Sequence, residues 1–262
     1  AAAILVMTEA TAERGISILE VADGAVSGDT DKTNVAFALV YGYDRLRKYD
    51  KGVAVASKLQ EQYPDSDSAF RWHALFLRAS GRSGQADVLA QERLRRVPGD
   101  VDALRQMAYN AIAREDFPKA HDIAQSIVKD GKGSTSELNG IAWYSLFTGK
   151  PSNSDVDAAL KAAQLSKNAW EILHTLGCLY AELGKLKEAR DVLVQAMDSA
   201  NFDEPDSNFW YAFGRIAEQA GERDLALADY ARVPTPKNPL DLPGSSYQLA
   251  QTRLKALQKP VK

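Results

Sequence analysis

Turn-forming and small residues recur along this chain at a nearly constant step. One series has intervals of 34, 34, 34, 35 and 37 residues and consists of Arg47, Gly81, Glu115, Gly149, Gly184 and Gly221. Two further series keep nearly the same step: Val40, Ala74, Ala108, Ala142, Gly177, Gly214 and Ala56, Ala90, Ala124, Ala159, Leu193, Tyr230. A period of this length with small residues at fixed phases indicates stacked two-helix units rather than one closed core. We therefore predict an all-α, right-handed α-solenoid of antiparallel helix pairs.

Residues 170–200 show one such unit most clearly. A first helix is predicted from an apolar stripe at helical spacing, formed by Leu173, Leu176, Gly177 and Tyr180. Gly184 then stands where a left-handed cap would end that helix. A second helix follows, with an inner face formed by Leu186, Ala189, Leu193 and Ala196. Small residues on both helices are expected to let the two backbones approach closely.

This unit resembles the tetratricopeptide repeat, whose pattern sets Leu-Gly, Tyr, Gly, Ala, a large residue, Ala and Pro at fixed positions. The matching residues are Leu173, Leu176, Gly177, Tyr180, Gly184, Ala189, Leu193 and Ala196, with Asn201 in place of the final Pro. Six units in phase start near residues 33, 67, 101, 135, 170 and 207, so the resemblance covers 33–233. Some positions depart from the pattern: Gly52 and Asp155 replace Ala, Glu115 replaces Gly and Ala217 replaces Tyr.

The segments outside the array are expected to be helical in part. Residues 1–32 are predicted to form a helical segment of a preceding repeat, with a turn-rich break at 27–31 and with Ile18, Ala22 and Ala25 facing inward. Residues 234–262 are predicted to form a link, which four prolines keep from being helical, and a capping helix that begins at Ser245 or Ser246. Such a terminal helix would cover the apolar face of the last repeat.

Composition excludes several classes of function. The formal net charge of -3 argues against a general nucleic-acid binder, which would present a basic face. No apolar run approaches the roughly 20 residues that span a bilayer, so no membrane insertion is expected. Cys178 is the one cysteine and can form no intrachain disulfide, which suits the cytoplasm and the periplasm equally.

The sequence predicts no catalytic residue, cofactor or metal site, and therefore no enzyme. The three histidines are too scattered for a helical metal pair, and no zinc or phosphate-loop spacing is present. Cys178 would need a base and an orienting partner to act as a nucleophile, and His174, four residues earlier on the same helix face, is the one hint of such a pair. The favoured alternative is that Cys178 is a small residue packed on a repeat face beside the imidazole of His174, without a catalytic role.

The first helix of each unit is expected to line a concave groove. Arginines gather on the first three units and aromatic residues recur at positions that the repeat does not require, and both types often anchor interfaces. Packing against the adjacent unit is the alternative for the aromatics, and ion pairing with Asp44 or Asp102 is the alternative for the arginines. The candidate partner-binding residues are Phe37, Tyr41, Arg45, Arg71, Arg78, Arg105, Tyr109, Asn139, Trp143, His174, Tyr211 and Arg215.

The predicted function is protein–protein scaffolding, with a peptide or protein segment bound in the groove through acidic groups. Repeats that clamp a chaperone's C-terminal carboxylate use Lys and Asn at two groove positions of neighbouring first helices. Here the series from Phe37 to Tyr211 contains no Lys and the series from Tyr41 to Arg215 contains no Asn, so that subclass is not expected. The order of the last units also resembles the C-terminal repeat tails of large bacterial transglutaminase-like proteins. That resemblance implies a non-catalytic tail of a periplasmic or secreted enzyme; without it the cytoplasm is expected. An oligosaccharide groove is a weaker third reading, and the oligomeric state stays open.

Overall fold

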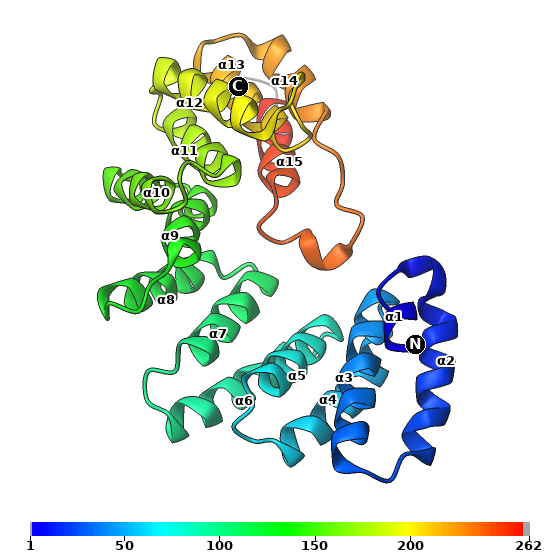
Figure 1. Ribbon diagram of the computed structural model, residues 1–262. Coiled ribbons are helices and arrows are strands. Elements are labelled where there is room, and N and C mark those ends of the chain that lie inside the picture. Colours follow the sequence, from blue (N-terminus) through cyan, green and yellow to red (C-terminus); the bar gives the residue numbers. More distant parts are fainter. Residues whose placement is uncertain (1, 259–262) are drawn as a thin grey trace. The chain divides into compact units, whose positions relative to one another are not determined.

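The computed structural model describes residues 2–258 and is built from helices. It contains no strand in that range, and its α-helices are α1 (Ala2–Leu5), α2 (Glu9–Ala25), α3 (Asp29–Arg45), α4 (Tyr49–Gln62), α5 (Asp67–Ala79), α6 (Ser83–Arg96), α7 (Val101–Ala113), α8 (Phe117–Lys129), α9 (Thr135–Thr148), α10 (Asn153–Leu165), α11 (Trp170–Glu182), α12 (Leu186–Ala200), α13 (Phe209–Gln219), α14 (Arg223–Ala231) and α15 (Ser246–Leu257). A single 3₁₀ turn, η1 (Pro239–Asp241), lies between the last two (Figure 1). The predicted all-α helical-repeat fold is confirmed.

The chain divides into two compact units, which we describe separately. Unit 1 ends at Asn110 and unit 2 begins at Ala111, so the boundary falls inside α7. In unit 1 each helix packs against its neighbours in the sequence from α1 to α6. In unit 2 the first helices α9, α11 and α13 contact one another in turn, and each also packs against the second helix that follows it.

Left-handed backbone ends the first helices where the periodic residues stand. All six positions of the first series have positive φ, namely Arg47 (53°), Gly81 (79°), Glu115 (58°), Gly149 (70°), Gly184 (71°) and Gly221 (86°). Glycine adopts this conformation without steric cost, whereas Arg47 and Glu115 place a Cβ atom in it. The left-handed cap predicted at Gly184 is therefore confirmed, and the same conformation recurs at the other five positions, including the two that lack glycine.

Matched residue sizes hold the helix pairs together. The second-helix series Ala56, Ala90, Ala124, Ala159, Leu193 and Tyr230 is buried throughout. Opposite Leu193 stands Gly177, and a Cβ atom there would come within 2.6 Å of the leucine side chain. Opposite Tyr230 stands Gly214, where the same atom would lie 2.7 Å from the ring. The glycines of the Leu-Gly position thus make room for the larger residues of the second helix.

The repeat that starts near residue 135 departs from the pattern at Asp155, and this residue caps the second helix of the repeat. Asp155 takes the place of the usual Ala and is buried. Its carboxylate accepts hydrogen bonds from the backbone N–H and the hydroxyl of Ser152, at 2.8 and 2.7 Å, which closes a capping box at the start of α10. The other carboxylate oxygen lies 2.9 Å from Nε2 of His121. The departure from the pattern therefore supplies a polar residue with its full set of partners.

The N-terminal segment differs from its prediction in two ways. Helix α3 begins at Asp29 because aspartates at 29 and 31 stabilise its first turn, so the break before it is confined to residues 26–28. The inward face of α2 consists of Ala12, Gly15, Ile16 and Leu19, whereas Ile18 is 44% exposed and Ala25 is also exposed. The prediction was therefore wrong for Ile18 and Ala25, whereas Ala22 is half-buried. The three-part division at residues 32 and 233 stays a prediction, and residues 1 and 259–262 lie outside the described part.

The last helix packs against the last helix pair. Leu249 and Ala250 of α15 join the core of unit 2, beside α13 and α14. Arg253 of α15 also forms an ion pair with Glu218 of α13, with Nε 3.0 Å from Oε2. The side chain of Ser245 caps the helix by accepting a hydrogen bond from the backbone N–H of Gln248 at 3.2 Å. Helix α15 thus covers an apolar surface that the pair α13–α14 would otherwise expose.

Candidate functional site

The twelve predicted residues fall on first helices of both units. Seven lie on α3, α5 and α7 in unit 1, and they are Phe37, Tyr41, Arg45, Arg71, Arg78, Arg105 and Tyr109. Five lie on α9, α11 and α13 in unit 2, and they are Asn139, Trp143, His174, Tyr211 and Arg215. We name the two sets the α3–α5–α7 face and the α9–α11–α13 face.

Aromatic side chains on the α3–α5–α7 face are open to solvent. Tyr41 is 50% exposed and meets Trp72 of α5 edge to face, with ring centroids 5.0 Å apart. Tyr109 of α7 is 44% exposed. Phe37, by contrast, is half-buried and packs against the core of unit 1. Two of the three predicted aromatic anchors are therefore accessible, and the third is a packing residue.

Two arginines of the α3–α5–α7 face share one carboxylate. Nη1 of Arg71 lies 3.2 Å from Oδ2 of Asp102, and Nη1 of Arg105 lies 3.5 Å from its Oδ1. The ion pairing with Asp102 that the sequence offered as an alternative is therefore present. The side chain of Asp102 is only 16% exposed, so its carboxylate is part-buried between the two arginines. Arg45, at the end of α3, is exposed.

Arg78 has the most unusual surroundings of the predicted arginines. Its Nη1 donates to the amide oxygens of Gln106 and Asn110, at 3.1 and 3.2 Å, and its guanidinium lies 5.4 Å from the ring centroid of Tyr109. Burial, which removes water from the charged form, lowers the pKa of Arg78 to about 10. No carboxylate of the described residues comes within ion-pair distance of it. A part-buried cation therefore faces neutral acceptors only.

Sequence reasoning missed the residues that position this arginine. Gln106 and Asn110 are buried on α7, and Asn110 Nδ2 donates in turn to Asp87 Oδ1 at 2.9 Å. Gln106 follows Arg105 and Asn110 follows Tyr109, two residues predicted to point to the groove. Both amides lie on the side of α7 that meets the preceding helix pair, α5–α6. The signal that could have revealed them is polarity, because the matching positions on α3 are Ala38 and Gly42.

On the α9–α11–α13 face, two predicted residues belong to an internal network. Tyr211 is buried, and its hydroxyl donates to Glu182 at 2.5 Å. Arg215 forms ion pairs with Glu182 at 2.9 Å and with Glu218 at 3.3 Å. Burial, followed by the field of Glu182, raises the pKa of Tyr211, so the phenol stays protonated. These two side chains hold α11 to α13, and we remove them from the candidate site.

His174 is also an internal residue. Its Nε2 lies 3.0 Å from the carbonyl oxygen of Asn208 and therefore carries the proton that this bond requires. Burial lowers the pKa of His174 to about 4, so the imidazole is neutral at pH 7. The thiol of Cys178 lies 3.6 Å from the same nitrogen and, because burial raises its pKa, stays protonated. A protonated Nε2 cannot accept the thiol proton, so this pair has no nucleophile–base geometry. Among the described residues, no group of three or more His, Cys, Asp or Glu side chains could hold a metal ion.

Trp143 makes an unexpected contact across the sequence. Its indole N–H donates to the carbonyl oxygen of Gly244 at 2.7 Å, 101 residues further on. Beside it is a cavity of about 570 Å³, lined by α9 and α11 residues such as Asn139, Trp170 and His174 on one side. Residues of the segment between α14 and α15 line the other side. The predicted Asn139 and Trp143 therefore meet a part of the chain itself.

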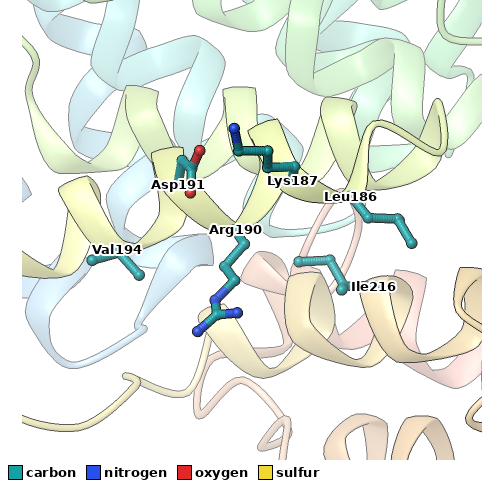
Figure 2. Close-up of a pocket in the computed structure, with 6 residues that line it drawn as sticks. All are labelled: Leu186, Lys187, Arg190, Asp191, Val194 and Ile216. Atoms are coloured by element: carbon teal, nitrogen blue, oxygen red, sulfur yellow. The ribbon is translucent and has the colours of Figure 1, made fainter.

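A further hollow of about 700 Å³ lies at α12 and α13, away from every predicted residue. Figure 2 shows its lining, which is Leu186, Lys187, Arg190, Asp191, Val194 and Ile216. Three of the six are charged and exposed, so the lining is that of an open surface.

The geometry defines a helical-repeat protein whose first helices present the candidate surfaces. Residues 171–203 match the family model of the tetratricopeptide repeat, which confirms the resemblance seen in the sequence. A tetratricopeptide repeat protein from Parabacteroides merdae is similar in structure, with a TM-score of 0.65 at 14% identity, over 95% of this chain and 93% of that one. Pseudomonas aeruginosa pilF is similar with a TM-score of 0.54 at 18% identity, over 84% and 96%.

A third similar structure is YrrB, described as a tetratricopeptide repeat protein with an unusual peptide-binding site. Its TM-score is 0.51 at 16% identity, over 76% of this chain and 97% of that one. At these identities the likeness concerns the fold. No curated protein sequence matches the chain. None of the helices in residues 2–258 has the length and apolar character needed to cross a bilayer.

Proposed function

We propose that the chain is a protein–protein interaction scaffold whose α3–α5–α7 face binds an extended peptide that contains an acidic residue. The observation that supports this is Arg78, a part-buried guanidinium without a carboxylate partner among the described residues. Burial removes water from the Arg78 guanidinium, and a bound carboxylate would accept hydrogen bonds from it in place of that water. Such charge-assisted hydrogen bonds contribute about 1.5–3 kcal/mol each.

The surroundings of Arg78 suit such a ligand. Arg78 is on α5, and the helices before and after it in the series carry exposed rings, Tyr41 on α3 and Tyr109 on α7. Aromatic residues of this kind often dominate binding energy. Arg71 and Arg105 add positive charge beside Asp102, which favours the approach of an acidic chain. The similar fold of YrrB, which is described as having a peptide-binding site, supports the same class of function.

A peptide array tests the proposal. Extended peptides with Asp or Glu at one position would be compared with the same peptides carrying Asn or Gln, first on wild type and then on Arg78→Gln. We expect the acidic peptides to bind better and to lose at least tenfold in affinity with Arg78→Gln. The matched control is Arg95→Gln, which removes the same charge from an exposed site on α6. Equal loss in both variants would reduce the effect to overall charge and refute the proposal.

A separate prediction is that the chain is the non-catalytic tail of a bacterial secreted or periplasmic enzyme. Such a tail would position the enzyme or its substrate. The gene sequence upstream of Ala1 decides it, since it would encode a transglutaminase-like domain or not.

A further inference from the structure

The segment between α14 and α15 lines one cavity together with residues of α9 and α11. We call residues 234–245 the proline segment; its four prolines are Pro234, Pro236, Pro239 and Pro243. Figure 1 shows it as a long loop that leaves α14, turns at a short helix and returns to α15. Its residues Pro234, Pro236 and Lys237 line one wall of the 570 Å³ cavity whose other wall includes Trp143, Trp170 and His174.

Main-chain atoms attach the proline segment to α9. The bond from Trp143 Nε1 to the Gly244 carbonyl, at 2.7 Å, uses an indole N–H as the donor and a backbone oxygen as the acceptor. Aromatic grooves recognise proline-rich peptides with the same groups, because proline removes backbone donors and leaves the carbonyl oxygens free to accept.

The backbone conformation at Gly244 favours glycine. Its φ is 78°, and a Cβ atom added there would lie 3.3 Å from Ile112 and 3.5 Å from Phe117. A left-handed residue with a Cβ atom would therefore be strained at this end of the segment, beside two apolar side chains of the same unit.

The apolar side chains of the proline segment contribute little to the attachment. Leu240 and Leu242 are 42% and 38% exposed, and the cavity remains between the segment and the helices. Trp143 holds the segment at its C-terminal end, and the two leucines of the segment are not packed into a core. An attachment of this kind is easier to open than the helix packing around it.

We propose that the surface of α9 and α11 around Asn139 and Trp143 is a binding site for extended, proline-containing peptide segments of a partner protein, and that the chain's own proline segment covers it as an intramolecular competitor. Tethering gives the resident segment an effective concentration in the millimolar range, so a free peptide of equal affinity competes poorly. A partner peptide binds when it makes more contacts inside the cavity than the resident segment does. This proposal concerns unit 2 and does not depend on the acidic-peptide site of unit 1.

A peptide in trans provides the test. The probe is a fluorescein-labelled peptide with the sequence of residues 233–246, and the control peptide has its four prolines changed to alanine. In the test protein, residues 235–244 are replaced by a Gly/Ser chain of equal length with Ser at position 244, because a Cβ atom there strains the φ of 78° and weakens the bond to Trp143, while Ser245 and α15 are kept. By fluorescence anisotropy, we expect the probe to bind this variant at least tenfold more tightly than wild type. Adding Trp143→Phe, which keeps a ring but removes the N–H, should weaken that binding at least fivefold.

Three results would overturn the proposal: no binding to the Gly/Ser variant at millimolar peptide, equal binding to wild type, or no effect of Trp143→Phe. If the Gly/Ser variant does not fold, Trp143→Phe in the wild-type chain decides instead. Protease cleavage within 234–245 should then become at least tenfold faster, and an unchanged rate would refute the intramolecular attachment. Arg78→Gln should leave probe binding unchanged, so failure here is distinguishable from failure of the unit 1 site.

Discussion

Gly52 of α4 lies against the ring of Phe76 of α5, so closely that a Cβ atom on the glycine would stand 2.4 Å from Cε1. Phe76 is fully buried and stacks on Trp72, with ring centroids 5.5 Å apart. The glycine that departs from the repeat pattern thus accommodates an aromatic residue on the next helix.

Gly52→Ala should therefore destabilise the protein, although alanine is the usual residue at this repeat position. Overpacking costs about 1–3 kcal/mol, which exceeds the gain in helix propensity. Urea unfolding measures the change. Gly84→Ala on α6 is the control, because its Cβ would meet no atom within 4 Å, and it should be neutral or stabilising. A Gly52→Ala protein as stable as wild type would contradict the close contact.

A double-mutant cycle should show strong coupling between Gly177 and Leu193. Leu193→Ala leaves a cavity and should cost about 2–5 kcal/mol. Gly177→Ala alone should destabilise because its methyl group meets Leu193 at 2.6 Å. In the Leu193→Ala background the same change should stabilise, since it fills part of the cavity and recreates the pair Ala142–Ala159 of the preceding unit. Additive free energies of unfolding would disprove the pairing.

Glu115→Gly should stabilise the protein by about 0.5–1 kcal/mol. The φ of Glu115 is 58°, a conformation that costs a residue with a Cβ atom about 1–2 kcal/mol, partly offset by the greater freedom of glycine in the unfolded chain. Gly149→Ala makes the reverse change where φ is 70° and no atom lies within 4 Å, so the backbone alone should make it destabilising. Thermal unfolding of both variants checks the pair, and effects of the same sign would contradict it.

The stability of the protein should fall between pH 7 and pH 5 because of His174. Its pKa is lowered from 6.5 to about 4 in the folded state, so the unfolded state binds a proton that the folded state excludes as the pH falls through 6.5. At pH 5 this difference amounts to about 2 kcal/mol, at 1.36 kcal/mol per pKa unit. Comparing unfolding free energies of wild type and His174→Gln across this range isolates the effect. Parallel pH curves for the two proteins would exclude it.

The periodic part of the fold was predictable from sequence because period and backbone conformation have one cause. Each first helix must end in a left-handed residue to turn into the second, so Gly81 and Gly184 reveal the step, and Arg47 and Glu115 follow from phase alone. Asn139 and Trp143 were likewise placed on a first helix. What faces them was not predictable, because the bond between Trp143 and Gly244 joins a repeat to a segment without periodicity.

Burial on the candidate faces was the other feature that the sequence did not reveal. The sequence predicts that Tyr211 lines the groove. In the structure its hydroxyl donates to Glu182 on the preceding first helix, and the side chain is buried. Arg78 was selected for its charge, whereas its importance comes from the neutral amides of Gln106 and Asn110. Such differences arise from contacts between consecutive repeats, and a residue pattern within one repeat does not predict those contacts.

The matched sizes of facing residues also limit how this array could have diverged from a common ancestral unit. Ala74 faces Ala90 in phase, whereas Gly177 meets Leu193 and Gly214 meets Tyr230. Passing from a pair of alanines to glycine and tyrosine takes two substitutions. If the tyrosine came first, the intermediate was overfilled, and if the glycine came first, it was underfilled. Either order passes through a mismatched helix pair, so the two facing positions of one repeat constrain each other's substitutions.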